Sequence, residues 1–198
     1  MTKRMFDLVV ATVALLAMAP ILLLAMLAIR IDSPGPAAFR QERVGRGGRV
    51  FRIHKLRTMF VDASARGPAV TAHDDARVTR VGRVLRHYRI DELPQLIDVI
   101  KGDMSLVGPR PEVPCFVAAY PPALRDELLA VRPGLTDPAA LEFANEAAEL
   151  AEAADPERMY IERILPRKLQ LQADYLRRAT LGSDLAVLGR TLKLLLAR

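Results

Sequence analysis

Two adjacent carboxylates, Asp91 and Glu92, lie between arginine-rich stretches of the chain. Carboxylates beside cations stay ionised at neutral pH. An ionised carboxylate among phosphate-binding cations can attack phosphorus and form an acyl-phosphate, and it can also hold Mg²⁺ against a diphosphate. An Asp-Glu pair on a protein surface is most often only solvated, so the interpretation depends on the surrounding residues.

Basic side chains on both sides of the pair supply the cations that phosphate chemistry needs. Guanidinium forks match phosphate oxygens bidentately. The candidates for phosphate and substrate binding are Lys55, Arg57, Arg86 and Arg110, with Arg89 close by. At strand period Lys55 and Arg57 share one face. Arg110 stands in the sequence Gly-Pro-Arg-Pro, whose prolines restrict the backbone. These features predict a fixed, phosphate-binding site around the carboxylates.

Other kinds of site are not indicated. The chain has no Walker loop, no GxGxxG before a helix and no HExxH. Its three histidines lack metal-ligand spacing, and a single cysteine, Cys115, excludes a disulfide framework or a cysteine metal cluster. A reducing, cytoplasmic location fits this composition.

Charge is distributed unevenly along the 198 residues. Residues 1–90 carry 16 Lys and Arg against 6 Asp and Glu, a net charge of +10, whereas residues 91–198 carry 13 against 17, a net charge of −4. A basic half suits phosphates, nucleic acid or an anionic membrane surface, and charge alone does not choose among them.

The segment Leu8–Ile29 contains 22 residues without a charge. As a straight helix it would extend roughly 33 Å, about the hydrocarbon thickness of a bilayer. The run is longer than the apolar part of a signal peptide, and it has no polar face of the kind expected for a buried core helix. Arginine and lysine flank both ends, which favours keeping both on the cytoplasmic side. Because Pro20 removes a helix hydrogen bond, we expect a re-entrant membrane helix broken at Pro20 rather than a spanning one.

The elements that must position the site follow this segment. A glycine-rich turn at Val44–Arg49 lies between two extended runs and predicts a β-hairpin. Leucines in Leu181–Leu196 form an amphipathic stripe, which fits either core packing or a helix lying in the membrane plane. We predict an α+β, mainly helical fold. It comprises a membrane helix over residues 1–30 and a compact cytosolic, membrane-associated catalytic domain over 31–198, with interfacial amphipathic helices.

Several long motifs resemble the monotopic phosphoglycosyl transferases, the bacterial sugar transferase family, in its small form with a single catalytic domain. The motifs are KRMFDLVVA, SPGPAAFRQERVGRGGRVFRIHKLRTM, DDARVTRVGRVLRHYRIDELPQLIDVIKGDMSLVGPRPE, VRPGLTDPA and DPERMYIERILPRKLQ. Together they cover most of the chain, and the DELPQL…KGDMSLVGPRP block is highly specific.

The resemblance implies a two-step transfer. Asp91 would be the nucleophile that attacks the β-phosphate of a UDP-sugar and releases UMP, with Glu92 beside it. Polyprenol (undecaprenyl) phosphate would then take the phosphosugar and leave as polyprenol diphosphate-sugar. Mg²⁺ is the implied cofactor, with Asp91 also touching the metal, and Lys55, Arg86 and Arg110 match basic positions around the phosphates. The implied enzyme initiates a bacterial surface glycoconjugate, such as an exopolysaccharide or lipopolysaccharide, at the cytoplasmic face of the inner membrane. Its partners are the lipid bilayer and its substrates, without nucleic acid, and a homo-oligomer is compatible with it.

The chain departs from the family pattern in two places. Arg89 stands where relatives often have a hydroxyl two residues before the nucleophile. In the sequence PGLTDPAALEFAN, Asp137, Ala140 and Ala144 replace a glycine, a glutamine and an arginine. If this segment contacts nucleotide or sugar in relatives, those contacts differ here, which leaves the donor sugar open.

Two readings compete with the enzyme. A membrane-tethered basic binding module explains the charge and the anchor, but it gives DELPQL and GPRP no purpose. An inactive scaffold relative is the other alternative, although every chemically essential position is filled. Release of UMP from a UDP-sugar separates both alternatives from the enzyme.

Overall fold

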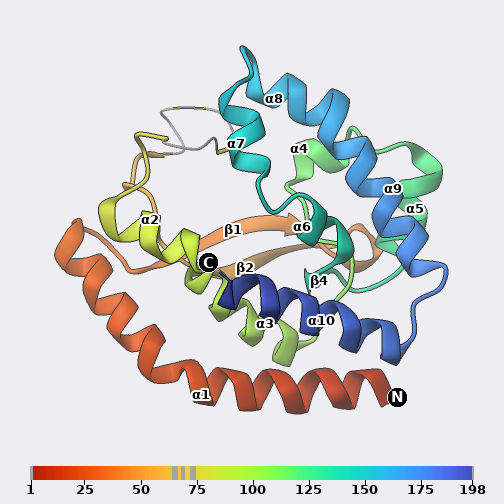
Figure 1. The fold of residues 1–198 in the computed structure, drawn as a ribbon, viewed down its shortest axis with the longest axis horizontal. Coiled ribbons are helices and arrows are strands. Elements are labelled where there is room, and N and C mark those ends of the chain that lie inside the picture. Colours follow the sequence, from red (N-terminus) through yellow and green to blue (C-terminus); the bar gives the residue numbers. More distant parts are fainter. Residues whose placement is uncertain (1, 64–66, 68–69, 72–74, 198) are drawn as a thin grey trace.

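A computed structural model gives the fold of residues 2–63, 67, 70–71 and 75–197 (Figure 1). The chain is mainly helical, with two small two-stranded sheets among the described residues, as expected for the α+β class. The first half contains α1 (Thr2–Asp32), β1 (Ala38–Val44), η1 (Arg46–Gly48), β2 (Val50–Leu56), α2 (Arg80–His87), η3 (Ile90–Gln95) and α3 (Leu96–Lys101). The second half contains β3 (Ser105–Val107), α4 (Pro114–Val117), α5 (Pro122–Leu129), β4 (Gly134–Thr136), α6 (Pro138–Glu142), α7 (Glu146–Ala151), α8 (Pro156–Met159), η4 (Tyr160–Ile164), α9 (Leu165–Leu176) and α10 (Leu181–Leu196).

Helix α1 is long and apolar enough to cross a bilayer by length and composition. It continues through Pro20 as one helix, in contrast to the predicted break, and α1 is bent along its length (Figure 1). A bend is the expected response, because proline removes one hydrogen bond and its ring crowds the preceding turn. The helix on either side retains its own bonds.

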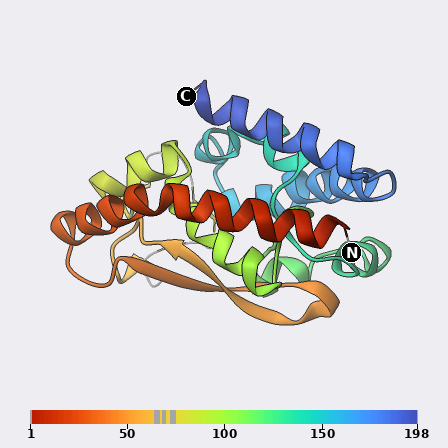
Figure 2. The same cartoon turned by 90° about the horizontal axis from the view of Figure 1, so that it is seen from below.

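The same helix contributes to the core of the protein. Ala11 packs in a cluster with Val99 and Met104, and Ile29 packs in a second cluster with Leu56 and Leu85. Seen from below, α1 runs across the underside of the molecule (Figure 2). The hydropathy of the chain changes near the boundary predicted at residue 30, but the side chains of α1 pack against residues on the other side of that boundary.

Strands β1 and β2 form the predicted antiparallel hairpin, with Ala38 opposite Leu56 and Val44 opposite Val50. Gly47 and Gly48 in the connecting turn have φ angles of +68° and +77°. These angles are costly for residues with a Cβ, which explains the glycine-rich turn. The hairpin brings Lys55, near the end of β2, beneath η3.

Strands β3 and β4 form a short parallel pair that sequence analysis did not predict. A Cβ on Gly134 would lie 2.1 Å from the main-chain nitrogen of Gly108, so this close approach requires glycine. The pair places the Gly-Pro-Arg-Pro segment, which follows β3, at the edge of the site.

Helix α10 matches the predicted boundaries, and its leucine stripe is only partly buried. Leu181, Leu185 and Leu192 are exposed, whereas Val187 is the buried apolar residue of this helix. Leu188 of the stripe packs against the cluster that contains Ala11 and Val99, so core packing accounts for part of the stripe and leaves its other leucines exposed.

Candidate active site

Asp91 and Glu92 lie in the first turn of η3, a short 3-10 helix between α2 and α3. Both are buried, with 2% and 8% of their surfaces exposed. Arg89, two residues before Asp91, has a φ angle of +55°, in the left-handed region. A non-glycine residue there costs of order 1–3 kcal/mol, and such strain concentrates at functional sites. The sharp turn that ends α2 is thus what presents the pair.

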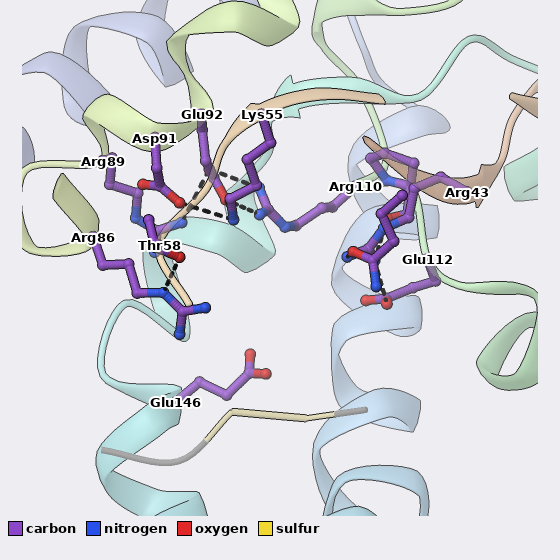
Figure 3. A network of polar contacts seen from close by, with 12 residues as sticks. Arg43, Lys55, Thr58, Arg86, Arg89, Asp91, Glu92, Arg110, Glu112 and Glu146 are labelled. Atoms are coloured by element: carbon purple, nitrogen blue, oxygen red, sulfur yellow. Dashed lines mark hydrogen bonds and ion pairs between the residues drawn. The ribbon is translucent and has the colours of Figure 1, made fainter. Parts of the chain in front are cut away.

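Three cations surround Glu92 (Figure 3). Arg110 binds both of its carboxylate oxygens, with one contact of 3.2 Å, from Nη1 to Oε2, and a second, very short one from Nη2 to Oε1. Lys55 Nζ lies 3.4 Å from Oε1, and Arg89 Nη1 lies 3.5 Å from Oε2. Burial by itself raises the pKa of Glu92, but the charges of Arg110, Lys55 and Arg89 outweigh it and hold that pKa well below its usual range. Glu92 is therefore an ionised anchor for the cations.

Asp91 is bound differently. Its Oδ2 lies 2.9 Å from Lys55 Nζ, and this is the only ion pair that it makes within the described part of the chain. One lysine thus touches both carboxylates, while Glu92 takes the two arginines. This division leaves Asp91 the less constrained of the two anions and the better placed to react.

Lys55 is positioned from behind by α3. Asp98, which is 1% exposed, accepts a 2.8 Å hydrogen bond from the main-chain N–H of His54 and contacts His54 Nδ1 at 2.5 Å. The two contacts fasten β2 to α3 one residue before Lys55. Asp98 was not among the predicted site residues, because its effect passes through the main chain of another element.

Arg86 approaches the same site from α2. Its Nε donates a 2.8 Å hydrogen bond to the Thr58 hydroxyl (Figure 3). Burial lowers the pKa of Arg86, and the negative charge of Asp91 partly offsets this lowering. Helix α2 can come this close because Gly82 has no side chain: a Cβ there would lie 2.1 Å from the Thr58 carbonyl oxygen.

Arg57 does not join the site, in contrast to the prediction. It is 5% exposed and donates to the carbonyl oxygens of Ser33 and Pro34, just beyond the end of α1. The prediction used strand alternation, but β2 ends at Leu56, so the alternation does not extend to Arg57. Its role is to fix the exit from α1.

The segment that carries Arg110 is held on both sides. The Gly108 N–H donates to Thr136 O and the Gly134 N–H donates to Pro109 O, which continue the β3–β4 pairing. On the other side Arg43 Nη1 donates to Pro111 O at 3.1 Å. The Glu92 carboxylate raises the pKa of Arg110. A rigid main chain therefore aims a permanently charged guanidinium at Glu92.

A metal ion would find one suitable ligand group here rather than a cage. Among the residues that the structure describes, no group of three or more His, Cys, Asp or Glu side chains could hold a metal. Mg²⁺ commonly binds through one or two carboxylates together with substrate phosphates and water. Asp91, which lies beside Lys55 and close to arginine side chains, fits that kind of site and does not fit a closed protein site.

Comparison with known proteins gives a consistent result. The family described as bacterial sugar transferase matches residues 1–198. A UDP-glucose:undecaprenyl-phosphate glucose-1-phosphate transferase of Caulobacter vibrioides is 41% identical over 196 residues, which are 98% of this chain and 69% of that protein. An undecaprenyl-phosphate glucose phosphotransferase of Komagataeibacter xylinus is 39% identical over 197 residues, 96% of this chain and 35% of that protein.

A relative named for a different sugar matches a shorter region. The UDP-N-acetylgalactosamine-undecaprenyl-phosphate N-acetylgalactosaminephosphotransferase of Aeromonas hydrophila is 48% identical over 118 residues, which are 60% of this chain and 28% of that protein. This chain thus spans only about a third of the length of two of the three relatives.

Proposed function

Since the chain belongs to the bacterial sugar transferase family, we propose that it moves a phosphosugar from a UDP-sugar to undecaprenyl phosphate. The relatives named above act on undecaprenyl phosphate but carry different sugars, so the donor sugar stays open. The observation that carries the proposal is the buried carboxylate pair: among the described residues Glu92 forms ion pairs with two arginines and with Lys55, whereas Asp91 forms an ion pair with the shared Lys55 alone.

In the proposed first step a carboxylate oxygen of Asp91 attacks the β-phosphorus of the UDP-sugar. The bond from that phosphorus to the bridging oxygen breaks, UMP leaves with the electron pair, and the phosphosugar is bound to Asp91 as an acyl-phosphate. Lys55 and the guanidinium groups of Arg86 and Arg110 would bind the phosphate oxygens as charge shifts. Because Asp91 is buried and forms an ion pair with Lys55, the incoming phosphate must replace the carboxylate as the partner of that lysine.

In the second step an oxygen of undecaprenyl phosphate attacks the same phosphorus. The bond to Asp91 breaks, and the products are the free carboxylate and undecaprenyl diphosphate-sugar. No proton needs to be removed from the acceptor, because its phosphate oxygen is already anionic. We expect this product to initiate a bacterial surface glycoconjugate.

We propose that Asp91 also contacts Mg²⁺ together with the substrate diphosphate. A bound Mg²⁺ would neutralise charge on the diphosphate and so favour departure of UMP.

The test is release of UMP from a panel of UDP-sugars, with undecaprenyl phosphate and Mg²⁺ present. We expect UMP and a lipid-linked phosphosugar from one or a few donors. A basic binding module or an inactive scaffold would release no UMP from any of them, and that outcome would refute the enzyme.

We further propose that the protein is monotopic and sits at the cytoplasmic face of the inner membrane. Near the start of α1, Lys3 pairs with Asp184 of α10 at 2.6 Å, and Arg4 donates to Val99 O and Ile100 O. At its other end, Asp32 accepts a 3.0 Å bond from the Val81 N–H. Both ends of α1 thus contact the same domain, which argues against a helix that crosses the bilayer.

The outer face of α1 supports contact with lipid. It exposes large apolar side chains along its whole length, namely Met5, Val9, Val13, Leu16, Ile21, Leu23, Leu24, Met26, Leu27 and Ile31. Exposed leucines on α10 add to the apolar surface. Patches of this extent mark membrane or protein contacts.

Single cysteines at the two ends of α1 test this topology. In a Cys115→Ser background we expect Thr2→Cys and Arg40→Cys to react with a membrane-impermeant maleimide only in inside-out vesicles, because both positions are cytoplasmic. The Arg40→Cys variant serves as the control for domain orientation. Labelling of Thr2→Cys in right-side-out vesicles would show a spanning helix and contradict the monotopic arrangement.

A further inference from the structure

Asp137 is a buried carboxylate that the chemical steps above do not use. It is 1% exposed and precedes the short helix α6. Its Oδ1 accepts a 2.6 Å bond from the Ala140 N–H, and its Oδ2 accepts bonds from the Arg110 N–H at 2.9 Å and from Gln172 Nε2 at 2.6 Å. All three donors are neutral N–H groups, and within the described residues no Lys or Arg side chain forms an ion pair with it.

The bond to Arg110 continues the β3–β4 pairing beyond its last main-chain contact. The Gly108 N–H donates to the Thr136 carbonyl. Arg110 follows Gly108 by two residues, but the chain after β4 has by then turned into α6, which begins at Pro138. The Asp137 side chain therefore accepts the Arg110 N–H bond in place of a main-chain carbonyl. The main chain of Arg110 is thus held by a side chain on the adjoining strand end.

A carboxylate suits this position better than an amide. Its two oxygens accept three N–H groups at once, whereas an asparagine has one acceptor oxygen and an NH₂ that can only donate. In either orientation the amide would face at least one N–H with its own N–H. An unsatisfied buried donor is costly, so an asparagine at this position would lose the hydrogen bond from either the Arg110 N–H or the Ala140 N–H.

We propose that Asp137 is a positioning residue for the transfer: it holds the Arg110 main chain so that the guanidinium keeps both of its contacts to Glu92. The inference rests on the proposed function. Asp137 is too buried to touch a substrate, so this departure from the family pattern acts behind the site instead of at the donor sugar.

The test compares Asp137→Asn with Asp155→Asn, measuring the initial rate of UMP release at saturating substrates. Asp155 makes an equivalent bond, 3.0 Å from the Arg158 N–H at the start of α8, on the exposed surface. We expect Asp137→Asn to lower the rate about tenfold, the worth of one strong hydrogen bond, and Asp155→Asn to leave it unchanged. Equal rates in the two variants would overturn the inference.

A double variant separates positioning from a general loss of stability. Arg110→Ala removes the guanidinium but keeps the N–H that Asp137 binds, and we expect it alone to lower the rate about ten- to a hundredfold. If Asp137 acts through the guanidinium, adding Asp137→Asn should cost less than about twofold more, because coupled sites are not additive. A full further tenfold loss would show that Asp137 acts independently and would refute positioning.

Gln172→Leu provides a second variant should Asp137→Asn not fold. It removes one donor to the same carboxylate oxygen at similar side-chain volume, and we expect a loss of about twofold to fivefold that again disappears in the Arg110→Ala background. A loss that persists in that background counts against the inference. A wild type that releases no UMP, in contrast, refutes the proposed function itself.

Discussion

Asp91→Asn is expected to abolish transfer, to the background of the assay. The substitution keeps the shape of the side chain but removes the anionic oxygen that we propose attacks phosphorus, so the covalent intermediate should not form. Incubation with a UDP-sugar and Mg²⁺, without undecaprenyl phosphate, followed by the mass of the intact protein, measures this step directly. The wild type should gain the mass of one phosphosugar, and Asp91→Asn should gain nothing.

Asp126→Asn is the matched control for that experiment, because Asp126 is an exposed aspartate on α5. It should acquire the phosphosugar like the wild type. An adduct on Asp91→Asn would mean that another group is the nucleophile, and the mechanism proposed here would then be wrong.

Glu92→Gln should be severe through a different step. The carboxylate of Glu92 forms ion pairs with three cations, and losing its charge weakens contacts worth roughly 1.5–3 kcal/mol each. We expect overall turnover to fall about a hundredfold or more. Asp91, the proposed nucleophile, is still present in this variant, so the phosphosugar adduct should form, although slowly. Comparing the rate of adduct formation with the rate of complete transfer measures this difference.

Glu162→Gln serves as the control, because Glu162 pairs with Arg158 at 2.8 Å on the exposed surface. Exposed ion pairs contribute little to stability, so we expect Glu162→Gln to turn over at the wild-type rate. If Glu92→Gln also turned over at the wild-type rate, Glu92 would not be the anchor of the cations, and the division of roles within the pair would fail.

Local patterns were sufficient to predict several elements. Glycines mark the tight turn of the β1–β2 hairpin, and regularly spaced leucines predicted α10 with its boundaries. The carboxylate pair and Lys55, Arg86 and Arg110 were also found from residue type and spacing. These features depend on neighbours along the chain, which sequence analysis can read.

Features that depend on distant contacts were missed or misread. The parallel strands β3 and β4 have three residues each, and their pairing joins segments separated by two helices. Arg57 was assigned to the site by strand period, but the strand ends one residue earlier and the carbonyl groups beyond α1 bind the side chain. Asp137 was identified in the sequence as a departure from the family pattern, but its burial and its hydrogen bond to Gln172 depend on the distant helix α9.

The packing of α1 has a consequence for how the protein is made. Ala11 and Ile29 complete two of the apolar clusters that support η3 and α3, while the opposite face of the helix is apolar and uncovered. The ribosome delivers this helix ahead of every residue of the candidate site, and the later segments assemble against it. A nascent chain whose α1 has not yet packed against the later segments has an incomplete core and an exposed apolar helix, which are features that chaperones and proteases recognise. If the uncovered face of α1 binds a membrane, as proposed, quality control and membrane delivery act on the same helix, and active protein would accumulate only where the proposed lipid substrate is found.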